Sequence, residues 1–128
     1  MPVVVLDSGG VSFLARRTPE SADYLRSLVR RKRWPPVVPT AVLVESLYGD
    51  PARDALTNML LRRCEVWTSL PLSVARRAAQ LRTMSRAGSA VDAIVVALAE
   101  PDGIVITSDP DDLLRLAAFA IAVRIERI

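Results

Sequence analysis

The sequence predicts an α/β fold in which helices cover both faces of a mostly parallel central sheet. Three observations support this fold class: short apolar runs alternate with helix-like segments, the two most apolar runs are typical of strands buried on both faces, and turn residues separate the elements. A chain of 128 residues is long enough for one sizeable core and too short for two, so residues 1–128 are expected to form a single domain.

The first half of the chain begins with the apolar run VVVL at residues 3–6, which predicts a buried strand that Ser8 and two glycines then end. A short helix is expected at 11–17. Thr18 is expected to cap a second helix that reaches about residue 32, with Pro19 at its first position. After the prolines at 35–36, we expect a strand at 37–38, a helix over 40–48, a turn at 49–51, a helix ending near residue 63, and a strand at 65–68.

The second half of the chain continues the alternation. Ser73 is expected to open an amphipathic helix that runs to about residue 87 and stops at Gly88. Ser89 caps an almost entirely apolar helix at 90–100. After a tight turn at 101–103, the run IVIT predicts the second core strand at 104–107. A helix starting at 109–110 and a strand at 121–125 complete the fold.

The composition excludes several classes of function. The chain contains no histidine, which excludes histidine general bases, the Ser-His-Asp and Cys-His nucleophilic systems, and nearly every zinc site built from protein ligands. The single cysteine, Cys64, excludes an internal disulfide and agrees with a reducing compartment. We find neither an apolar run of the roughly 18 residues that cross a bilayer nor the pattern of a signal peptide, so a cytoplasmic location is expected.

The basic residues give the chain a formal net charge of +3, and Lys32 is the only lysine among 17 basic residues. A polyanionic partner is one interpretation of this surplus, and a coding bias toward alanine and arginine is the other. The basic residues cluster at 16–17, 30–33, 62–63 and 76–77. The run Arg30, Arg31, Lys32 and Arg33 is the best candidate for a phosphate-contacting patch, and a solvated helix end is the alternative.

Two aspartates, Asp7 and Asp109, end the two most apolar strands. In open parallel sheets, ligands bind beyond the carboxyl ends of the strands, near the point where the strand order reverses, so both carboxylates are candidates for one site. Each also has a structural interpretation. Asp109 is suited to cap the helix that follows it, and Asp7 is suited to accept a hydrogen bond from the backbone of Gly9 or Gly10.

Two further acidic residues occupy unusual positions in predicted helices. Asp92 falls in the first turn of the apolar helix, where it either completes a capping box with Ser89 or contributes a carboxylate at the edge of the core. Glu45 falls in the middle of a helix among apolar residues, too late to act as a cap. If that helix face is buried, Glu45 needs an arginine, a metal or an altered pKa.

Together, the four carboxylates indicate a site for a hard cation in a chain without histidine. Mg²⁺ and Mn²⁺ prefer oxygen ligands, and phosphates are the usual partners of such ions in proteins. A bound cation would also relieve the repulsion between carboxylates that lie close together.

The order and settings of these residues resemble those of the PIN-domain ribonucleases, and most closely those of the VapC toxins of VapBC toxin–antitoxin pairs. The resemblance covers essentially the whole chain and is carried by the stretches VVVLDSGG, VPTAVLVESLYG, SAVDAIVVALAE and GIVITSDPDDL. It implies a PIN-like three-layer α/β/α sandwich and a Mg²⁺- or Mn²⁺-dependent endoribonuclease that cleaves structured RNA (tRNA or rRNA). It also implies a homodimer and a cognate VapB-type antitoxin that covers the acidic site.

The resemblance assigns roles to individual residues. It implies catalytic roles for Asp7, Glu45, Asp92 and Asp109, of which the three aspartates are the expected metal ligands, and a supporting hydroxyl at Thr107. Members of the family often carry one more acidic residue after the fourth. Asp111 and Asp112 both qualify for this role, and Asp112 is favoured because it lies in the first turn of the expected helix.

Other interpretations remain beside this one. The serious alternative is a PIN-like module that binds nucleic acid or protein without cleaving, and a nuclease directed at DNA is a weaker one. Receiver domains need a lysine after a late strand, and haloacid-dehalogenase-like phosphatases need an aspartate where this chain has Gly9. The glycine pair lacks the other residues of a P-loop, so it is expected to let a backbone, a water or an RNA phosphate approach Asp7.

Overall fold

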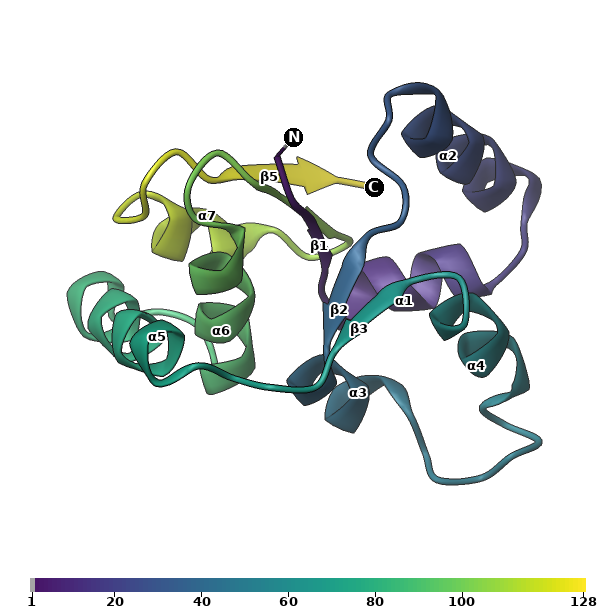
Figure 1. Ribbon diagram of the computed structural model, residues 1–128, viewed down its shortest axis with the longest axis horizontal. Helices are drawn as coiled ribbons and strands as arrows, with labels where there is room; N and C mark the ends of the chain where they lie inside the picture. The colour runs from purple at the N-terminus through teal and green to yellow at the C-terminus, as the bar shows by residue number, and fades with distance from the viewer. Residues whose placement is uncertain (1) are drawn as a thin grey trace.

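All five strands run parallel in a single sheet, in the spatial order β3-β2-β1-β4-β5. The computed structural model describes residues 2–128, and Figure 1 shows the sheet between two groups of helices. The chain builds outward from β1 to β3 and then returns to place β4 beside β1, so the strand order reverses between these two strands. The strands are β1 (Val4–Leu6), β2 (Val37–Pro39), β3 (Glu65–Trp67), β4 (Ile104–Thr107) and β5 (Arg124–Arg127).

The helices form the two outer layers and confirm the expected sandwich. Figure 1 shows α1, α2 and α4 on one side of the sheet and α5, α6 and α7 on the other, and both α1 and α6 pack against β1 and β4. Within residues 2–128, the helices are α1 (Ser8–Ala15), α2 (Pro19–Arg30), α3 (Thr40–Ser46), α4 (Ala55–Leu61), α5 (Leu72–Ser85), α6 (Ala90–Ala99) and α7 (Asp111–Ala117). None of these helices is both long and apolar enough to cross a membrane.

The core is centred on the pairing of β1 with β4. Val5 lies opposite Val105 and Leu6 opposite Ile106, and all four side chains are fully buried. Because each such side chain stabilises the fold by about 1.5–3 kcal/mol when it is removed from water, these two strands are a major source of the stability of the domain. They therefore provide a rigid base for whatever side chains follow them.

Two predicted helix starts are confirmed in detail. Thr18 caps α2 by accepting a hydrogen bond from the backbone N–H of Ser21. Ser89 and Asp92 form a capping box at the start of α6, in which each side chain accepts a hydrogen bond from the backbone N–H of the other. The capping box is worth about 1 kcal/mol to the helix and fixes the position of the Asp92 carboxylate.

The strand expected at 121–125 is wrong in position, because β5 begins three residues later at Arg124. Ile121 is 62% exposed and Ala122 has a positive φ of 55°, which is incompatible with an extended strand. Pairing with β4 sets the true register, with Ile104 opposite Arg124. The strand lies at the edge of the sheet, where charged residues are favoured over apolar ones.

The starts of α1, α5 and α7 differ from those expected. α1 starts at Ser8, directly after β1, so Gly9 and Gly10 are helical and do not form a loop. α5 begins at Leu72 and ends through Arg86 in the left-handed conformation, two residues before Gly88. α7 starts at Asp111 after Pro110, so Asp109 is not the residue that caps it.

The two glycines of α1 allow the helix to pack closely against the end of β4. A Cβ atom on Gly10 would lie 2.6 Å from the carbonyl oxygen of Ile106, and a Cβ atom on Gly9 would lie 2.3 Å from Oγ of Ser108. The sequence led us to expect that a backbone, a water or an RNA phosphate needs the space beside these glycines. At Gly10 that space is occupied by the backbone of Ile106.

Substituting these glycines is expected to have unequal effects. Gly10→Ala places a methyl group against the backbone of a central strand, which cannot move aside, so the free energy of unfolding should fall by about 1–3 kcal/mol. Gly9→Ala should cost less, since the exposed Ser108 side chain can rotate, and the Ser108→Ala background should reduce its cost further. Urea denaturation of the variants tests this difference, and equal stability of the two alanine variants would contradict it.

Candidate active site at the carboxyl ends of β1 and β4

Asp7 lies at the junction of β1 and α1 and is 8% exposed. It caps α1, because Oδ1 accepts a hydrogen bond of 2.8 Å from the backbone N–H of Gly10. The hydroxyl of Thr107, at the end of β4, donates a hydrogen bond of 2.6 Å to the other oxygen, Oδ2. The carboxylate is thus held between the two central strands, at the point where the strand order reverses.

The pKa of Asp7 is raised above its usual value. Burial is the largest cause, the hydrogen bonds from Thr107 and Gly10 oppose it, and the negative charge of Asp92 raises the pKa further. Within residues 2–128, no arginine or lysine forms an ion pair with Asp7. The fold therefore brings a buried carboxylate close to a second one and leaves the pair without a neutralising side chain.

Asp92 is the second carboxylate, and it is half-buried in the first turn of α6. Its Oδ2 accepts the capping hydrogen bond from Ser89, while Oδ1 accepts none from the part of the chain that the structure describes. Asp92 can therefore complete the capping box with Ser89 and also contribute a carboxylate at the edge of the core. The capping box orients the side chain, and the carboxylate lies close enough to Asp7 for its charge to raise the pKa of Asp7.

The end of β4 carries Thr107, Ser108 and Asp109. Thr107 is fully buried, and its Oγ1 also accepts a hydrogen bond of 3.0 Å from the backbone N–H of Asp109. The Asp109 side chain is exposed. Asp111 and Asp112, the candidates for an additional acidic residue, are exposed as well, and Asp112 pairs with Arg115 of its own helix at 3.9 Å.

Glu45 lies on an exposed face of α3. Because its carboxylate is not buried, it does not need an arginine, a metal or an altered pKa. Val42 is the only buried residue of this helix, and Val44 is 82% exposed. Glu45 nevertheless lines a cleft that also includes Ser8, Gly9 and Ser108, which lie around the junction of β1 and α1 and the end of β4.

The four predicted carboxylates do not form one tight cluster. Across residues 2–128, the structure contains no group of three or more acidic or cysteine side chains arranged to hold a metal ion. It places Asp92 near enough to Asp7 for the two charges to interact, and it places Glu45 and Asp109 near the same edge of the sheet with exposed side chains.

The cleft lined by Ser8, Gly9 and Ser108 has a volume of about 450 Å³ and contains functional candidates that sequence reasoning missed. Arg16 and Arg53 contribute positive charge, Tyr48 contributes an aromatic ring, and Ser108 contributes a hydroxyl. Arg16 belongs to one of the basic clusters of the sequence, but no sequence signal distinguishes it from the other clusters. Arg53 and Tyr48 enter the cleft through the loop between α3 and α4.

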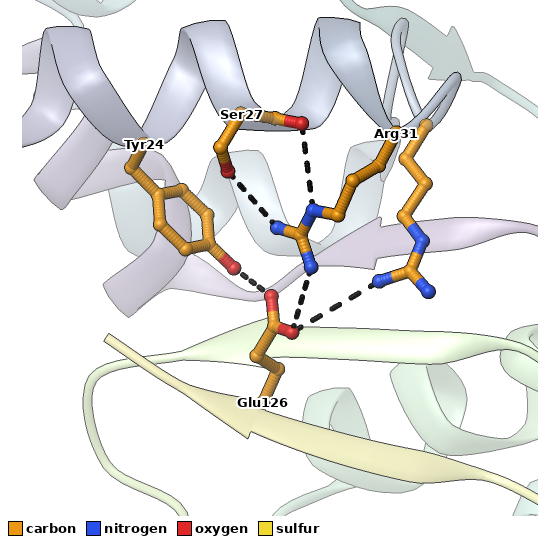
Figure 2. Close-up of polar contacts among 5 residues, drawn as sticks. Tyr24, Ser27, Arg31 and Glu126 are labelled. Carbon is orange, nitrogen blue, oxygen red and sulfur yellow. Dashed lines mark hydrogen bonds and ion pairs between the residues drawn. The ribbon is translucent and has the colours of Figure 1, made fainter.

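The run at 30–33 lies elsewhere. It directly precedes β2, at the amino-terminal side of the sheet, and none of its residues lines the cleft. Figure 2 shows Arg31 bound to Ser27 and to Glu126 of β5, which also accepts a hydrogen bond from Tyr24. Arg33 approaches the same carboxylate at 4.0 Å.

This ion-pair cluster accounts for the pKa of Glu126. Burial raises it, but the hydrogen bonds from Tyr24 and Arg31 outweigh that effect and hold the pKa of Glu126 below its usual value. Two of the four residues of the predicted phosphate patch are thus paired with an internal anion, which reduces the charge that they offer to an external one.

No protein-family model and no curated protein matches this sequence. Thirteen chains of solved structures match the fold. A chain of the DNA-bound VapBC complex from Salmonella typhimurium has a TM-score of 0.73 and 20% identity, over 99% of this chain and 98% of that one. The protein PAE2754 from Pyrobaculum aerophilum has a TM-score of 0.63 and 14% identity, over 97% of this chain and 90% of that one. These likenesses confirm the expected PIN-like fold.

Proposed function

We propose that this protein is a metal-dependent endoribonuclease of the VapC type, which acts as a toxin on structured RNA such as tRNA or rRNA in the cytoplasm. One observation carries the proposal: Asp7 is buried at the carboxyl ends of β1 and β4, where the strand order reverses, near enough to Asp92 for its charge to act on Asp7, and without a basic partner among residues 2–128. This is the edge at which α/β sheets bind ligands. The likeness to a chain of the VapBC complex supports the same class of protein.

The residues at this edge fit a hard cation. Mg²⁺ is commonly bound by one or two carboxylates together with waters and substrate phosphates, and Asp7 and Asp92 would hold it here. When bound, such an ion supplies Lewis-acid stabilisation of phosphate charge and lowers the pKa of a coordinated water.

The side chains of the protein have separate tasks in this proposal. Thr107 and the Gly10 N–H fix the orientation of Asp7. Arg16 lines the cleft and is suited to bind a phosphate next to the cut, a contact that is independent of base sequence and weakens with salt. Glu45, which lines the cleft from α3, is suited to orient the attacking water.

An antitoxin partner is the second part of the proposal. A groove of about 250 Å³ between α1, α2 and α4 is lined by apolar side chains such as Leu25 and Met59 and bordered by Arg17 and Arg63. Its chemistry suits an amphipathic segment that carries acidic residues, which we propose to be part of a VapB-type antitoxin. A homodimer also belongs to this proposal.

The purified protein is expected to cleave a panel of tRNA and rRNA substrates with Mg²⁺ or Mn²⁺ and to lose this activity in EDTA. The same ions should raise the melting temperature of the wild-type protein, because they bind only the folded chain, but not that of the Asp7→Asn/Asp92→Asn variant.

Undiminished cleavage in EDTA would contradict the proposal. RNA binding without cleavage of any substrate, together with no effect of the metal on melting, would favour the module that binds without cleaving.

A further inference from the structure

The loop between α3 and α4 presents an aromatic side chain to the cleft. Tyr48 is 68% exposed, and the guanidinium carbon of Arg53 lies 3.7 Å from the centre of its ring. Both side chains line the cleft that contains Ser8, Ser108 and Glu45. The guanidinium covers one face of the ring and leaves most of the side chain open.

A buried carboxylate holds this loop in place. Asp54 is 4% exposed, and its side chain accepts hydrogen bonds from three successive backbone N–H groups: 3.0 Å from Tyr48, 2.9 Å from Gly49 and 3.2 Å from Asp50. Asp50 in turn accepts a hydrogen bond of 2.9 Å from the backbone N–H of Ala52. The position of the Tyr48 backbone is therefore set before any ligand binds.

Such an arrangement suits a nucleobase better than a phosphate. A tyrosine ring backed by a guanidinium is a stacking surface for unpaired bases, which proteins use because every base has an aromatic face. Arg16 and the serine hydroxyls of the cleft are suited to the neighbouring phosphates. The cleft thus offers one surface for the phosphates of the RNA backbone and another for a base.

We propose that Tyr48 stacks on an unpaired base next to the phosphate that is cut, that Arg53 holds the ring in place, and that Asp54 is a positioning residue for both. This inference rests on the proposed action on RNA and names the residue that selects for an unpaired base at the cut. Substrates in which this base is paired should be cleaved poorly, because a paired base cannot reach the ring.

The test measures the binding of two fluorescent RNA oligomers of equal length in EDTA, where the proposed cleavage does not occur. One oligomer carries bases and the other is abasic. We expect Tyr48→Ala to weaken binding of the base-carrying oligomer roughly 10- to 100-fold, with little effect on the abasic oligomer. Tyr48→Phe keeps the ring and should bind like the wild type. Phe119→Ala, which removes an exposed aromatic ring outside the cleft, is the matched control.

Asp54→Asn tests the positioning role. It should reduce the preference for the base-carrying over the abasic oligomer in the wild-type background and have no further effect on that preference in the Tyr48→Ala background. A loss of fold stability alone would weaken binding of both oligomers equally and would overturn this role. Because the Tyr48 side chain is exposed, the Tyr48 variants are expected to fold. They keep the proposal testable even if Asp54→Asn does not fold.

Several results would overturn the inference. The wild-type protein binding neither RNA oligomer is one such result, and Tyr48→Ala weakening the binding of both oligomers equally is another. The inference would also be overturned if Tyr48→Phe lost RNA binding, or if Tyr48→Ala weakened binding of the antitoxin and left RNA binding unchanged. Failure of the proposed nuclease function has a different signature: base-dependent binding through Tyr48 would persist while Mg²⁺ and Mn²⁺ support no cleavage.

Discussion

Replacing Asp7 with asparagine is expected to reduce RNA cleavage by at least about 100-fold while leaving the protein as stable as the wild type or more so. The loss of activity follows from removing the charge that the proposed cation and the reacting phosphate depend on. The effect on stability follows from burial. Because desolvation raises the pKa of Asp7, its ionised form lowers the stability of the folded state as the pH rises above the usual pKa of 3.8.

The hydrogen bonds around residue 7 can accommodate this change. Gly10 N–H still donates to the amide oxygen of asparagine, and the asparagine NH₂ group can donate to Oγ1 of Thr107. The Thr107 hydroxyl then donates to the backbone oxygen of Asp109, which lies 3.2 Å away. No buried polar atom is therefore left without a partner, which is the usual cause of a large loss of stability.

Cleavage assays and urea denaturation of the same preparations would measure both effects. Asp102→Asn is a suitable control, since it removes an exposed carboxylate at the amino end of β4, where a positive φ of 66° also favours asparagine. Retained activity in Asp7→Asn would remove Asp7 from the proposed site. A large loss of stability in this variant would contradict the expectation that the charge of Asp7 destabilises the folded state.

The second large effect is expected at Arg77, where Arg77→Met should lower the free energy of unfolding by about 1–3 kcal/mol. Arg77 binds both oxygens of Glu100, at 2.8 and 2.9 Å, and also donates to the backbone oxygen of Phe119. Glu100 accepts a further hydrogen bond of 2.7 Å from the N–H of Ile121. The pair joins α5, the end of α6 and the segment before β5, and the Glu100 side chain is only 10% exposed.

Removing the arginine leaves a buried carboxylate without its partner, which costs more than the pair itself contributes. The variant Arg77→Met/Glu100→Gln should therefore regain part of the stability lost in Arg77→Met. Denaturation with urea at neutral pH would compare the single and double variants. A double variant that is less stable than Arg77→Met would contradict this account.

The same pair predicts a dependence on pH. The hydrogen bonds from Arg77 hold the pKa of Glu100 below its usual value of 4.5, so the unfolded chain binds this proton more readily than the folded one. The stability that the pair contributes is therefore present above pH 4.5 and is lost as the pH falls through the lower pKa of the folded state. Arg77→Met should lack this part of the acid sensitivity.

The sequence was most informative where strands are buried on both faces. The runs VVVL and IVIT are apolar throughout because β1 and β4 lie at the centre of the sheet, and helices cover both of their faces. The caps at Thr18 and Ser89 were also predictable, since a cap is made by residues three positions apart. The parallel sheet and the placement of Asp7 and Asp109 at its carboxyl edge follow from these local features.

Other features depend on contacts between distant residues and could not be predicted from local patterns. The segment at 121–125 is as apolar as a strand, and only pairing with β4 places β5 at Arg124–Arg127. The apolar residues around Glu45 suggested a buried helix face, yet α3 is short and buries only Val42. The hydrogen bond from Thr107 to Asp7 joins residues that are 100 positions apart.

The start of α1 directly after β1 has a consequence for how this cleft can change during evolution. Gly9 lines the cleft, and both Gly9 and Gly10 pack closely against the end of β4, so larger side chains at either position disturb the contact between α1 and the sheet. Tyr48 and Arg53 reach the cleft from the loop at 47–54, whose residues are largely exposed apart from Asp54. Substitutions in that loop can accumulate without loss of folding, and related chains are expected to diverge in RNA preference there while the wall next to β1 stays the same.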